Sequence, residues 1–332
     1  MKQALLFHEV DICLPSVLEL CPCKNSLPRA WAEDPCAPSE PHQRDHGFIM
    51  RHLFLFLMLF CVSLSLSGCD SKGSTNNTDP VIEARDGWEL VWNDEFSDTA
   101  IDTSKWSHEV NANGGGNNEL QYYTARSKNS FIEDGNLVIE AHAESFNDVE
   151  GSRDYTSARL RTKGKGDWKY GRFEIRARLP TGQGIWPAIW MLPTDWEYGG
   201  WAASGEIDIM EIIGSQPDLL HGTLHFGGVF PNNQSSGESY QLPSGSLNSE
   251  FHTYVIEWKE GEIRWYIDDF QYSRKTDWNS ANGAYPAPFD KRFHILLNVA
   301  VGGDWPGSPD ATTVFPQRME VDYVRVFKAT SE

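Results

Sequence analysis

Residues 205–211 read Gly-Glu-Ile-Asp-Ile-Met-Glu and carry three carboxylates within six residues. Side chains of a β-strand point alternately to opposite faces, so a strand here places Glu206 and Asp208 on one face. In a regular strand Glu211, an odd number of residues after Glu206 and Asp208, would point to the opposite face. A β-bulge at Met210 would absorb one residue and return Glu211 to the face of the other two acids. The stretch therefore predicts three acids along one wall of a cleft.

A simpler alternative is a strand whose charged face lies in water, because charged residues are mostly exposed. Like charges on one strand face repel each other, which disfavours such a strand unless the acids have a function. The stretch alone leaves both alternatives open. The question is whether the rest of the chain builds a cleft around it.

Composition narrows the class of partner. The chain has 332 residues, a formal net charge of −19 and 13 tryptophans. Phosphate neutralisation requires clustered Lys and Arg, so this charge argues against a nucleic-acid partner, and it disfavours sulfated polymers as substrates. Tryptophans offer flat apolar surfaces for stacking, although most tryptophans pack in protein cores.

The N-terminal part differs from the rest of the chain. Residues 1–49 contain four cysteines and no periodicity, and we interpret them as a mis-assigned or disordered extension before a true start at Met50. Residues 50–68 combine a short basic start with an apolar run, which is typical of a signal peptide. Residues 66–69, Leu-Ser-Gly-Cys, resemble the lipobox of bacterial lipoproteins, in which the cysteine, here Cys69, is acylated.

This interpretation predicts an exported bacterial lipoprotein, anchored to a membrane through Cys69 on the periplasmic or cell-surface side. Residues 69–84 are polar and predict a flexible tether. No cysteine follows Cys69, so the domain is expected to fold without disulfides despite its export.

From residue 88 onward, short β-branched or alternating runs are separated by Gly, Pro, Asn and Asp. The expected strands are residues 137–141, 171–178, 254–258, 263–268, 293–299 and 320–327. No helix longer than about two turns is expected. The pattern predicts an all-β domain over residues 85–330, formed by a single antiparallel β-sandwich with one sheet curved into a concave cleft.

Aromatic residues gather around the acid cluster. Trp186 and Trp190 differ by an even number, so both can face the cleft from one strand. Trp201 precedes the acids and His225 follows them. For each tryptophan the alternative is a place in the core, and for His225 it is a hydrogen-bonded structural role.

Six motifs occur in order along the chain. They are residues 117–123 (NNELQYY), 170–174 (YGRFE), 186–190 (WPAIW), 204–211 (SGEIDIME), 297–303 (LNVAVGG) and 321–326 (VDYVRV). On these motifs, residues 88–327 resemble glycoside hydrolase family 16, and within it the bacterial laminarinase-type endo-β-1,3-glucanases. The resemblance implies a β-jelly roll with a concave carbohydrate-binding cleft.

The resemblance also implies a chemistry. Family members hydrolyse by double displacement with retention, which requires two carboxyl groups about 5–5.5 Å apart. Matched motif to motif, Glu206 corresponds to the nucleophile, Asp208 to an assisting residue and Glu211 to the acid/base. The extra residue before Glu211 is typical of the bulged branch with laminarinases, agarases and carrageenases, rather than of lichenases.

Further residues follow from the resemblance alone. It implies stacking of glucose rings on Trp186, Trp190 and Trp201, and hydrogen bonds from His225 and Asn118 to hydroxyl groups. No cofactor is expected for catalysis, but a structural calcium on the convex side is implied at Glu95, Gly135 and Asp322. We expect a monomer whose partner is a β-glucan polysaccharide.

Several alternatives stay open at this stage. The same scaffold carries hydrolases of β-1,3-1,4-glucan or of agarose-type galactans, and transglycosylases. Relatives that have lost the catalytic acids are non-catalytic glycan-binding proteins of the cell surface. The loops at residues 194–201 and 227–240, which do not match the family closely, are expected to decide among endo action, exo action and tolerance of mixed linkages.

Overall fold

The structure is a computed structural model that describes residues 82 and 85–331. The predicted N-terminal extension (1–49), signal peptide (50–68), Cys69 and almost all of the tether (69–84) lie outside the described residues. Within the described part, no helix has the length and apolar character needed to cross a membrane. The predicted catalytic domain is the part that the structure shows.

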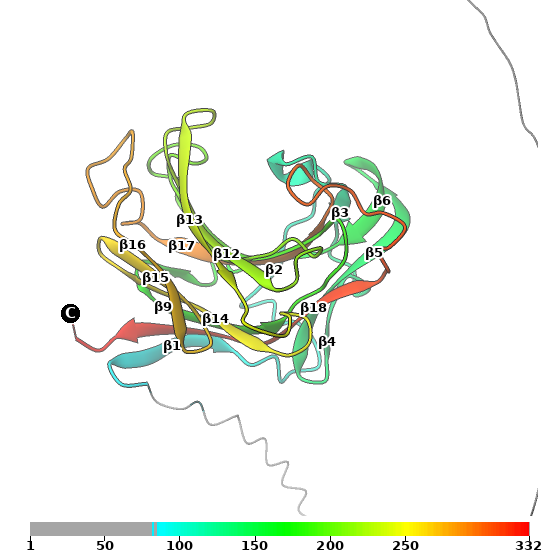
Figure 1. The fold of residues 1–332 in the computed structure, drawn as a ribbon, viewed down its shortest axis with the longest axis horizontal. Helices are drawn as coiled ribbons and strands as arrows, with labels where there is room; N and C mark the ends of the chain where they lie inside the picture. Colours follow the sequence, from blue (N-terminus) through cyan, green and yellow to red (C-terminus); the bar gives the residue numbers. More distant parts are fainter. Residues whose placement is uncertain (1–81, 83–84, 332) are drawn as a thin grey trace, which may run out of the picture. The chain divides into compact units, whose positions relative to one another are not determined.

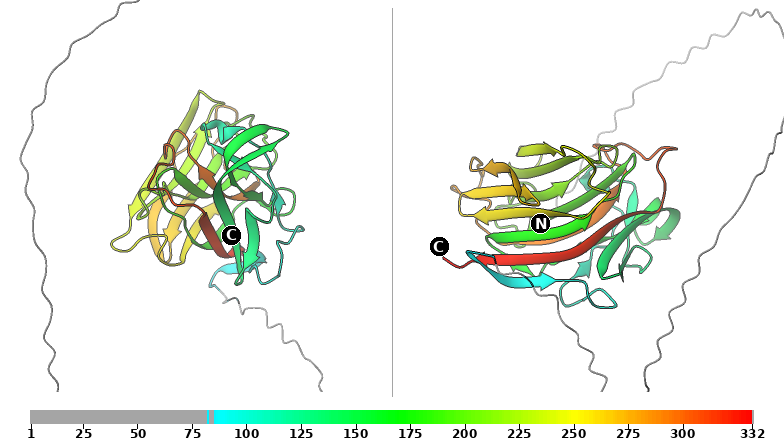
Figure 2. Two further views of the ribbon diagram at one scale, coloured as in Figure 1. Left: turned by 90° about the vertical axis from the view of Figure 1, so that its right-hand side faces the viewer. Right: turned by 60° about the horizontal axis from the view of Figure 1, so that its bottom comes forward.

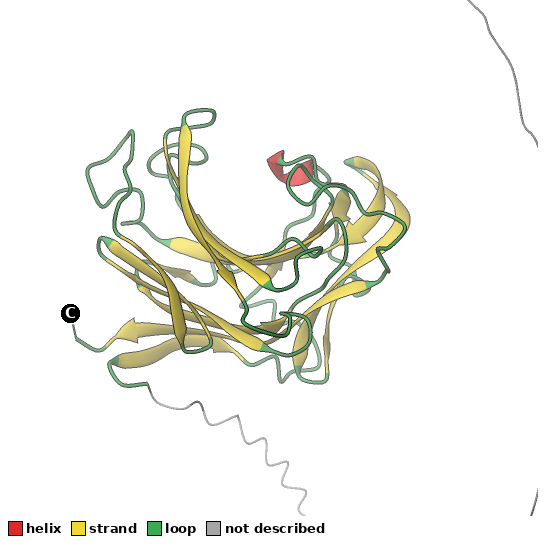
Figure 3. Cartoon of the chain, in the orientation of Figure 1, coloured by secondary structure: helices red, strands yellow, loops and turns green. Residues whose placement is uncertain are grey.

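Two β-sheets pack face to face, as predicted for a β-sandwich (Figure 1). One 3₁₀ turn, η1 (Gly114–Gly116), is the only helical element in the described residues, and Figure 3 shows how completely strands dominate the domain. All strand pairs described are antiparallel except the short β3–β6 pair, which is parallel. The all-β prediction is confirmed.

The first sheet has ten strands, and several of them lie side by side in the right-hand view of Figure 2. In order across the sheet they are β16 (Phe270–Lys275), β15 (Glu262–Ile267), β14 (His252–Lys259), β9 (Gly171–Arg178), β18 (Gln317–Ala329), β5 (Asn136–Asp148), β6 (Gly151–Ser157) and β3 (Gln121–Tyr123); β1 (Trp88–Asp94) pairs with β18 and β4 (Ser130–Glu133) with β5.

The second sheet has eight strands and curves, so that its hollow side faces away from the first sheet (Figure 1). In order they are β13 (Asn233–Gln241), β12 (Leu219–Gly227), β11 (Glu206–Glu211), β10 (Ile185–Pro193), β17 (Phe293–Val301), β7 (Arg159–Arg161) and β2 (Ser107–His108); β8 (Asp167–Trp168) pairs with β17. The acid-rich stretch forms β11, near the middle of this sheet.

Local sequence explains these strands. The clean alternation of residues 171–178 coincides with β9, and the apolar run at 293–299 lies within β17, all of whose residues are buried. The expected strands at 254–258 and 263–268 lie in β14 and β15, which form a hairpin closed by the pair Lys259–Glu262. Apolar side chains from the inner faces of both sheets form one continuous core, which includes Ile207, Ile209 and Met210 of β11. The core fixes which face of β11 remains for the cleft.

Candidate active site

A cavity of about 860 Å³ lies on the hollow face of the eight-stranded sheet. Side chains of β10, β11, β12 and β17 form its floor, and loops form its ends. Aromatic and carboxylic side chains are prominent in its lining, among them Trp186, Trp190, Trp196, Trp201, Phe230, Trp305, Glu119, Glu206, Asp208 and Glu211. An apolar cleft with a few convergent polar groups is the usual form of a ligand site.

The predicted β-bulge in β11 is present. Against β12, Asp208 pairs with Thr223 and Glu211 with His221, so two residues of β11 oppose one of β12. Against β10, Met210 still has a partner, and the residue that lacks one is Ile209. The bulge is therefore centred one residue earlier than predicted, but its effect is the same: Glu206, Asp208 and Glu211 all line the cavity.

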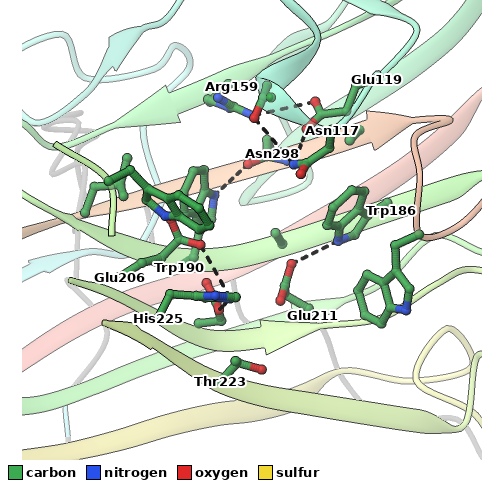
Figure 4. Close-up of a pocket in the computed structure, with 18 of the residues that line it drawn as sticks. Asn117, Glu119, Arg159, Trp186, Trp190, Glu206, Glu211, Thr223, His225 and Asn298 are labelled. Carbon is green, nitrogen blue, oxygen red and sulfur yellow. Dashed lines mark hydrogen bonds and ion pairs between the residues drawn. The ribbon is translucent and has the colours of Figure 1, made fainter. Parts of the chain in front are cut away.

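Two of the predicted tryptophans bind the two glutamates. Trp201 donates its Nε1–H to Glu206 Oε2 at 2.8 Å, and Trp186 donates to Glu211 Oε1 at 3.0 Å, as Figure 4 shows for the second pair. Trp190 lines the cavity between them and donates to Asn298 at 2.7 Å. Each indole is thus anchored at its polar edge, which fixes how its ring faces the cleft.

His225 lies beside the acids on the neighbouring strand, where the register pairs it with Glu206. Its Nε2 is 3.2 Å from Asp208 Oδ2 and 3.9 Å from Glu206 Oε1. Its ring also packs against that of Trp201, with the centroids 5.6 Å apart. His225 lines the cavity and contacts the acids, and its hydrogen bond to a sugar hydroxyl stays a prediction.

Burial raises the pKa of Glu206, Asp208 and Glu211, each to about 8. For the two glutamates the negative charge of Asp208 adds to the effect, whereas His225 and the indole donors oppose it. One carboxyl oxygen each of Glu206 and Asp208 and a ring nitrogen of His225 lie within 4.8 Å of one another, a spacing at which two ionised carboxylates repel. Near neutral pH the cluster therefore retains protons, and one of its acids is available as a proton donor.

A buried polar group at one end of the cleft was not predicted from the sequence. Arg159 lies 3.7 Å from Glu119 Oε2 and stacks over the ring of Trp190, 5.2 Å from its centroid (Figure 4). Tyr123 and Asn298 complete this group through hydrogen bonds. Glu119 and Asn298 belong to two of the six motifs, residues 117–123 and 297–303, and could have been predicted to lie in the site on that basis. No motif or local pattern indicated Arg159.

Loops add aromatic side chains that sequence analysis also did not assign. Trp305 meets Trp186 edge-to-face at 5.3 Å and His221 at 5.1 Å, and 41% of its surface is exposed. Phe230 lies near Trp201, with the ring centroids 6.5 Å apart. These rings extend the apolar surface beyond the acids at both ends.

Asn118 is not brought to the cleft. Its backbone is left-handed, with φ 58°, its side chain is exposed, and its amide donates to both carboxylate oxygens of Asp304 at 3.0 and 3.1 Å. The preceding Asn117 lines the cavity instead. A hydrogen bond from this segment to a ligand would therefore come from Asn117.

The predicted calcium positions lie in or next to strands of the ten-stranded sheet, and the carboxylates of Glu95 and Asp322 are already paired. Glu95 accepts two hydrogen bonds from Arg325 at 2.9 and 2.7 Å, and Asp322 forms an ion pair with Arg176. Gly135 lies in the turn between β4 and β5. In the described part of the chain, the one group of side chains close enough to hold a metal ion lies in the cleft. Because the carboxylates of Glu95 and Asp322 are bound to arginines, these two side chains are not arranged to hold a calcium ion. The calcium site stays a prediction.

A family model described as Glycosyl hydrolases family 16 matches residues 116–325. These residues include all three acids of β11 and the tryptophans that bind them. The site and the family match therefore concern the same part of the chain.

Individual relatives agree with this match. A beta-glucanase of Rhodothermus marinus is 45% identical over 283 residues, which are 79% of this chain and 91% of the relative. Glucan endo-1,3-beta-glucosidase A1 of Niallia circulans is 44% identical over 269 residues, 76% of this chain but only 39% of that longer protein. The solved laminarinase catalytic domain of Thermotoga maritima MSB8 is similar with a TM-score of 0.66 and 45% identity, over 74% of this chain and 99% of that domain.

The raised pKa values predict how stability depends on pH. In the unfolded chain the three carboxyls have ordinary pKa values, 3.8 for Asp and 4.5 for Glu. From about these pH values up to about pH 8, the folded state therefore binds more protons than the unfolded state. The free energy of unfolding should therefore fall as pH rises through this range, by about 1.4 kcal/mol per pH unit for each proton retained. Urea unfolding of the wild type and of E206Q/D208N/E211Q, measured at about pH 5 and pH 8, should show a larger loss for the wild type. Equal losses in both proteins would contradict the raised pKa values.

Proposed function

This chain belongs to glycosyl hydrolase family 16, and we propose that it is a retaining endo-glycosidase that hydrolyses internal β-1,3-glucosidic bonds of laminarin-type β-glucans. The observation that carries the proposal is the placement of Glu206, Asp208 and Glu211 on one face of a long, tryptophan-lined cleft. Relatives named laminarinase or endo-1,3-β-glucosidase support the substrate class.

In the proposed reaction, a carboxylate oxygen of Glu206 attacks the anomeric carbon while Glu211 gives its proton to the departing glycosidic oxygen. Water then attacks the same carbon, Glu211 takes a proton from this water, and the Glu206 carboxylate leaves. Two inversions give net retention. Asp208 lies beside Glu206, within 4.8 Å between carboxyl oxygens, where it can help to orient the nucleophile.

The surroundings of the two glutamates support this assignment. Each glutamate accepts an indole hydrogen bond that favours its ionised form, and Glu206 is the one whose carboxyl also lies 3.9 Å from His225 Nε2. The negative charge of Asp208 raises the pKa of both glutamates, and each has a further acidic neighbour, so Glu206 and Glu211 do not ionise together easily. The pair is therefore arranged to hold one charge and one proton.

A neutral glucan suits the cleft better than an anionic polymer. The glucose ring has apolar faces that can stack on the rings of Trp186, Trp190 and Trp201, which all line the cavity. The chain carries a formal charge of −19, and the cleft floor holds three acids. Sulfated galactans would be repelled from such a surface.

The proposed substrate class predicts a product pattern. The purified protein, incubated with laminarin, lichenan, agarose and carrageenan, should release a ladder of short oligosaccharides from laminarin, because internal cleavage produces fragments of several lengths. Chromatography of the products checks this. Release of glucose alone from laminarin would contradict endo action, and preferential cleavage of agarose or carrageenan would contradict the substrate class.

The roles of the two glutamates predict severe losses in variants. E206Q and E211Q should each lower kcat on laminarin by about three orders of magnitude or more, since each removes a group that acts on the reacting bond. E260Q, at an exposed glutamate in the β14–β15 turn, is the matched control and should keep its activity. Azide should restore turnover to Glu211→Ala and give a β-glycosyl azide. An α-glycosyl azide from this variant would show that the roles are exchanged.

We also propose that the enzyme is an exported lipoprotein, anchored through a lipid on Cys69. The support is the sequence alone: a basic start after Met50, an apolar run at residues 53–66 and the lipobox-like residues 66–69. A lipid chain with a polar tether would hold the domain at a membrane and leave it free to rotate.

This proposal predicts where the protein partitions. Expressed in a bacterium that processes lipoproteins, the wild type should sediment with membranes, and the peptide that begins at Cys69 should carry the mass of a lipid. Cys69→Ser should carry no lipid and should no longer sediment with membranes as the wild type does. Cys61→Ser, within the apolar run, should carry the lipid and sediment as the wild type does. A mature N-terminus elsewhere, without lipid, would refute the proposal.

A further inference from the structure

The position of Glu211 depends on the bulge in β11. With regular pairing, strand alternation would turn Glu211 towards the core and Met210 towards the cleft. In the structure Ile209 and Met210 are both buried in the core, and together they oppose Gly222 of β12. A feature that fixes this bulge therefore fixes the side of the sheet on which Glu211 lies.

One hydrogen bond crosses the core to the start of the bulge. Trp265 belongs to β15 of the ten-stranded sheet and is 1% exposed. Its Nε1–H donates to the backbone carbonyl of Asp208 at 2.8 Å. A bulge disrupts the ladder of its strand locally, so a backbone group there gains from a partner outside the sheet. The indole of Trp265 is such a partner.

Gly222 leaves the space that this contact requires. A Cβ atom at Gly222 would lie 2.6 Å from Cδ1 and 2.8 Å from Nε1 of Trp265, and 2.5 Å from the hydroxyl of Tyr272. Any larger residue would push the indole away from the bulge. The residue opposite the bulge is thus the one that lets the other sheet approach.

The ten-stranded sheet has its own irregularity at this place. Trp265 pairs with Ser273 and Tyr266 with Gln271, so Tyr272 is an extra residue in β16. The hydroxyl of Tyr272 is buried and reaches the same space beside Gly222. Irregular pairing in both sheets therefore meets at Trp265.

We propose that Trp265 is a positioning residue for the reaction: through the Asp208 carbonyl it fixes the β11 bulge and so keeps Glu211 in the cleft. The role of Glu211 rests on the proposed function, whereas its position does not. Trp265 is 1% exposed and is not among the residues that line the cavity, so its effect is expected on turnover rather than on affinity.

Trp258 provides a matched comparison. It lies on the adjacent β14, is fully buried, and donates its Nε1–H to the backbone carbonyl of Phe289 at 3.1 Å. It differs from Trp265 in that its acceptor lies outside β11. Trp258→Phe and Trp265→Phe therefore each remove a buried indole N–H donor. Only Trp265→Phe removes a hydrogen bond to the bulge in β11.

The test measures kcat, KM and thermal stability for both variants on laminarin. Both should lose similar stability, but W265F should lose at least tenfold in kcat with KM within twofold of the wild type, and W258F should keep both constants. Gly222→Ala, which displaces the indole, should reproduce W265F. The proposal is overturned if W265F keeps its kcat, or if W258F loses as much. Should W265F not fold, a benzothiophene in place of the indole of Trp265, which keeps the ring shape without the N–H, takes its place with the same outcomes.

A second readout does not depend on activity. In a crystal structure of W265F, the contact of 3.0 Å between Trp186 Nε1 and Glu211 Oε1 should be lost, because Glu211 moves with the register of β11. Retention of this contact would overturn the proposal even if kcat fell. If the wild type did not cleave laminarin, the proposed function would fail, and the crystal structure would still decide the positioning role.

Discussion

The crowding of three carboxyl groups on β11, with Asp208 buried and both glutamates partly buried, is the interaction on which the site depends. Buried charges without partners are costly, and neighbouring carboxylates repel one another, so the group holds protons that isolated acids would lose. Indole donors from Trp186 and Trp201, together with His225, stabilise the charge that remains. The curved sheet supplies these partners from strands on both sides of β11, which explains why the acids lie near its middle.

Features that depend on strand parity could be predicted from the sequence. Alternation is a local property, so residues 171–178 indicated β9 directly. The same rule placed Glu206 and Asp208 on one face and required a bulge for Glu211. It did not identify the bulged residue, because the register that leaves Ile209 unpaired against β10 is set by the neighbouring strand.

Features that depend on contacts between distant segments could not be predicted in this way. Arg159 meets Glu119 across 40 positions of the chain, and no local pattern relates the two. Asn118 was chosen from its motif, yet its left-handed backbone and its hydrogen bonds to Asp304 leave the cleft wall to Asn117. The motif was informative to within one residue, and backbone conformation decided between the two.

The pairing of β1 with β18 has a consequence for how the domain meets its surroundings. Trp88 lies opposite Ala329, so the chain enters the domain beside the place where it leaves, on the ten-stranded sheet. The cavity is lined by side chains of the other sheet, the eight-stranded one. Both ends of the domain therefore lie on the sheet that faces away from the groove. A long polysaccharide can then lie along the groove without meeting the strand ends at Trp88 and Ala329.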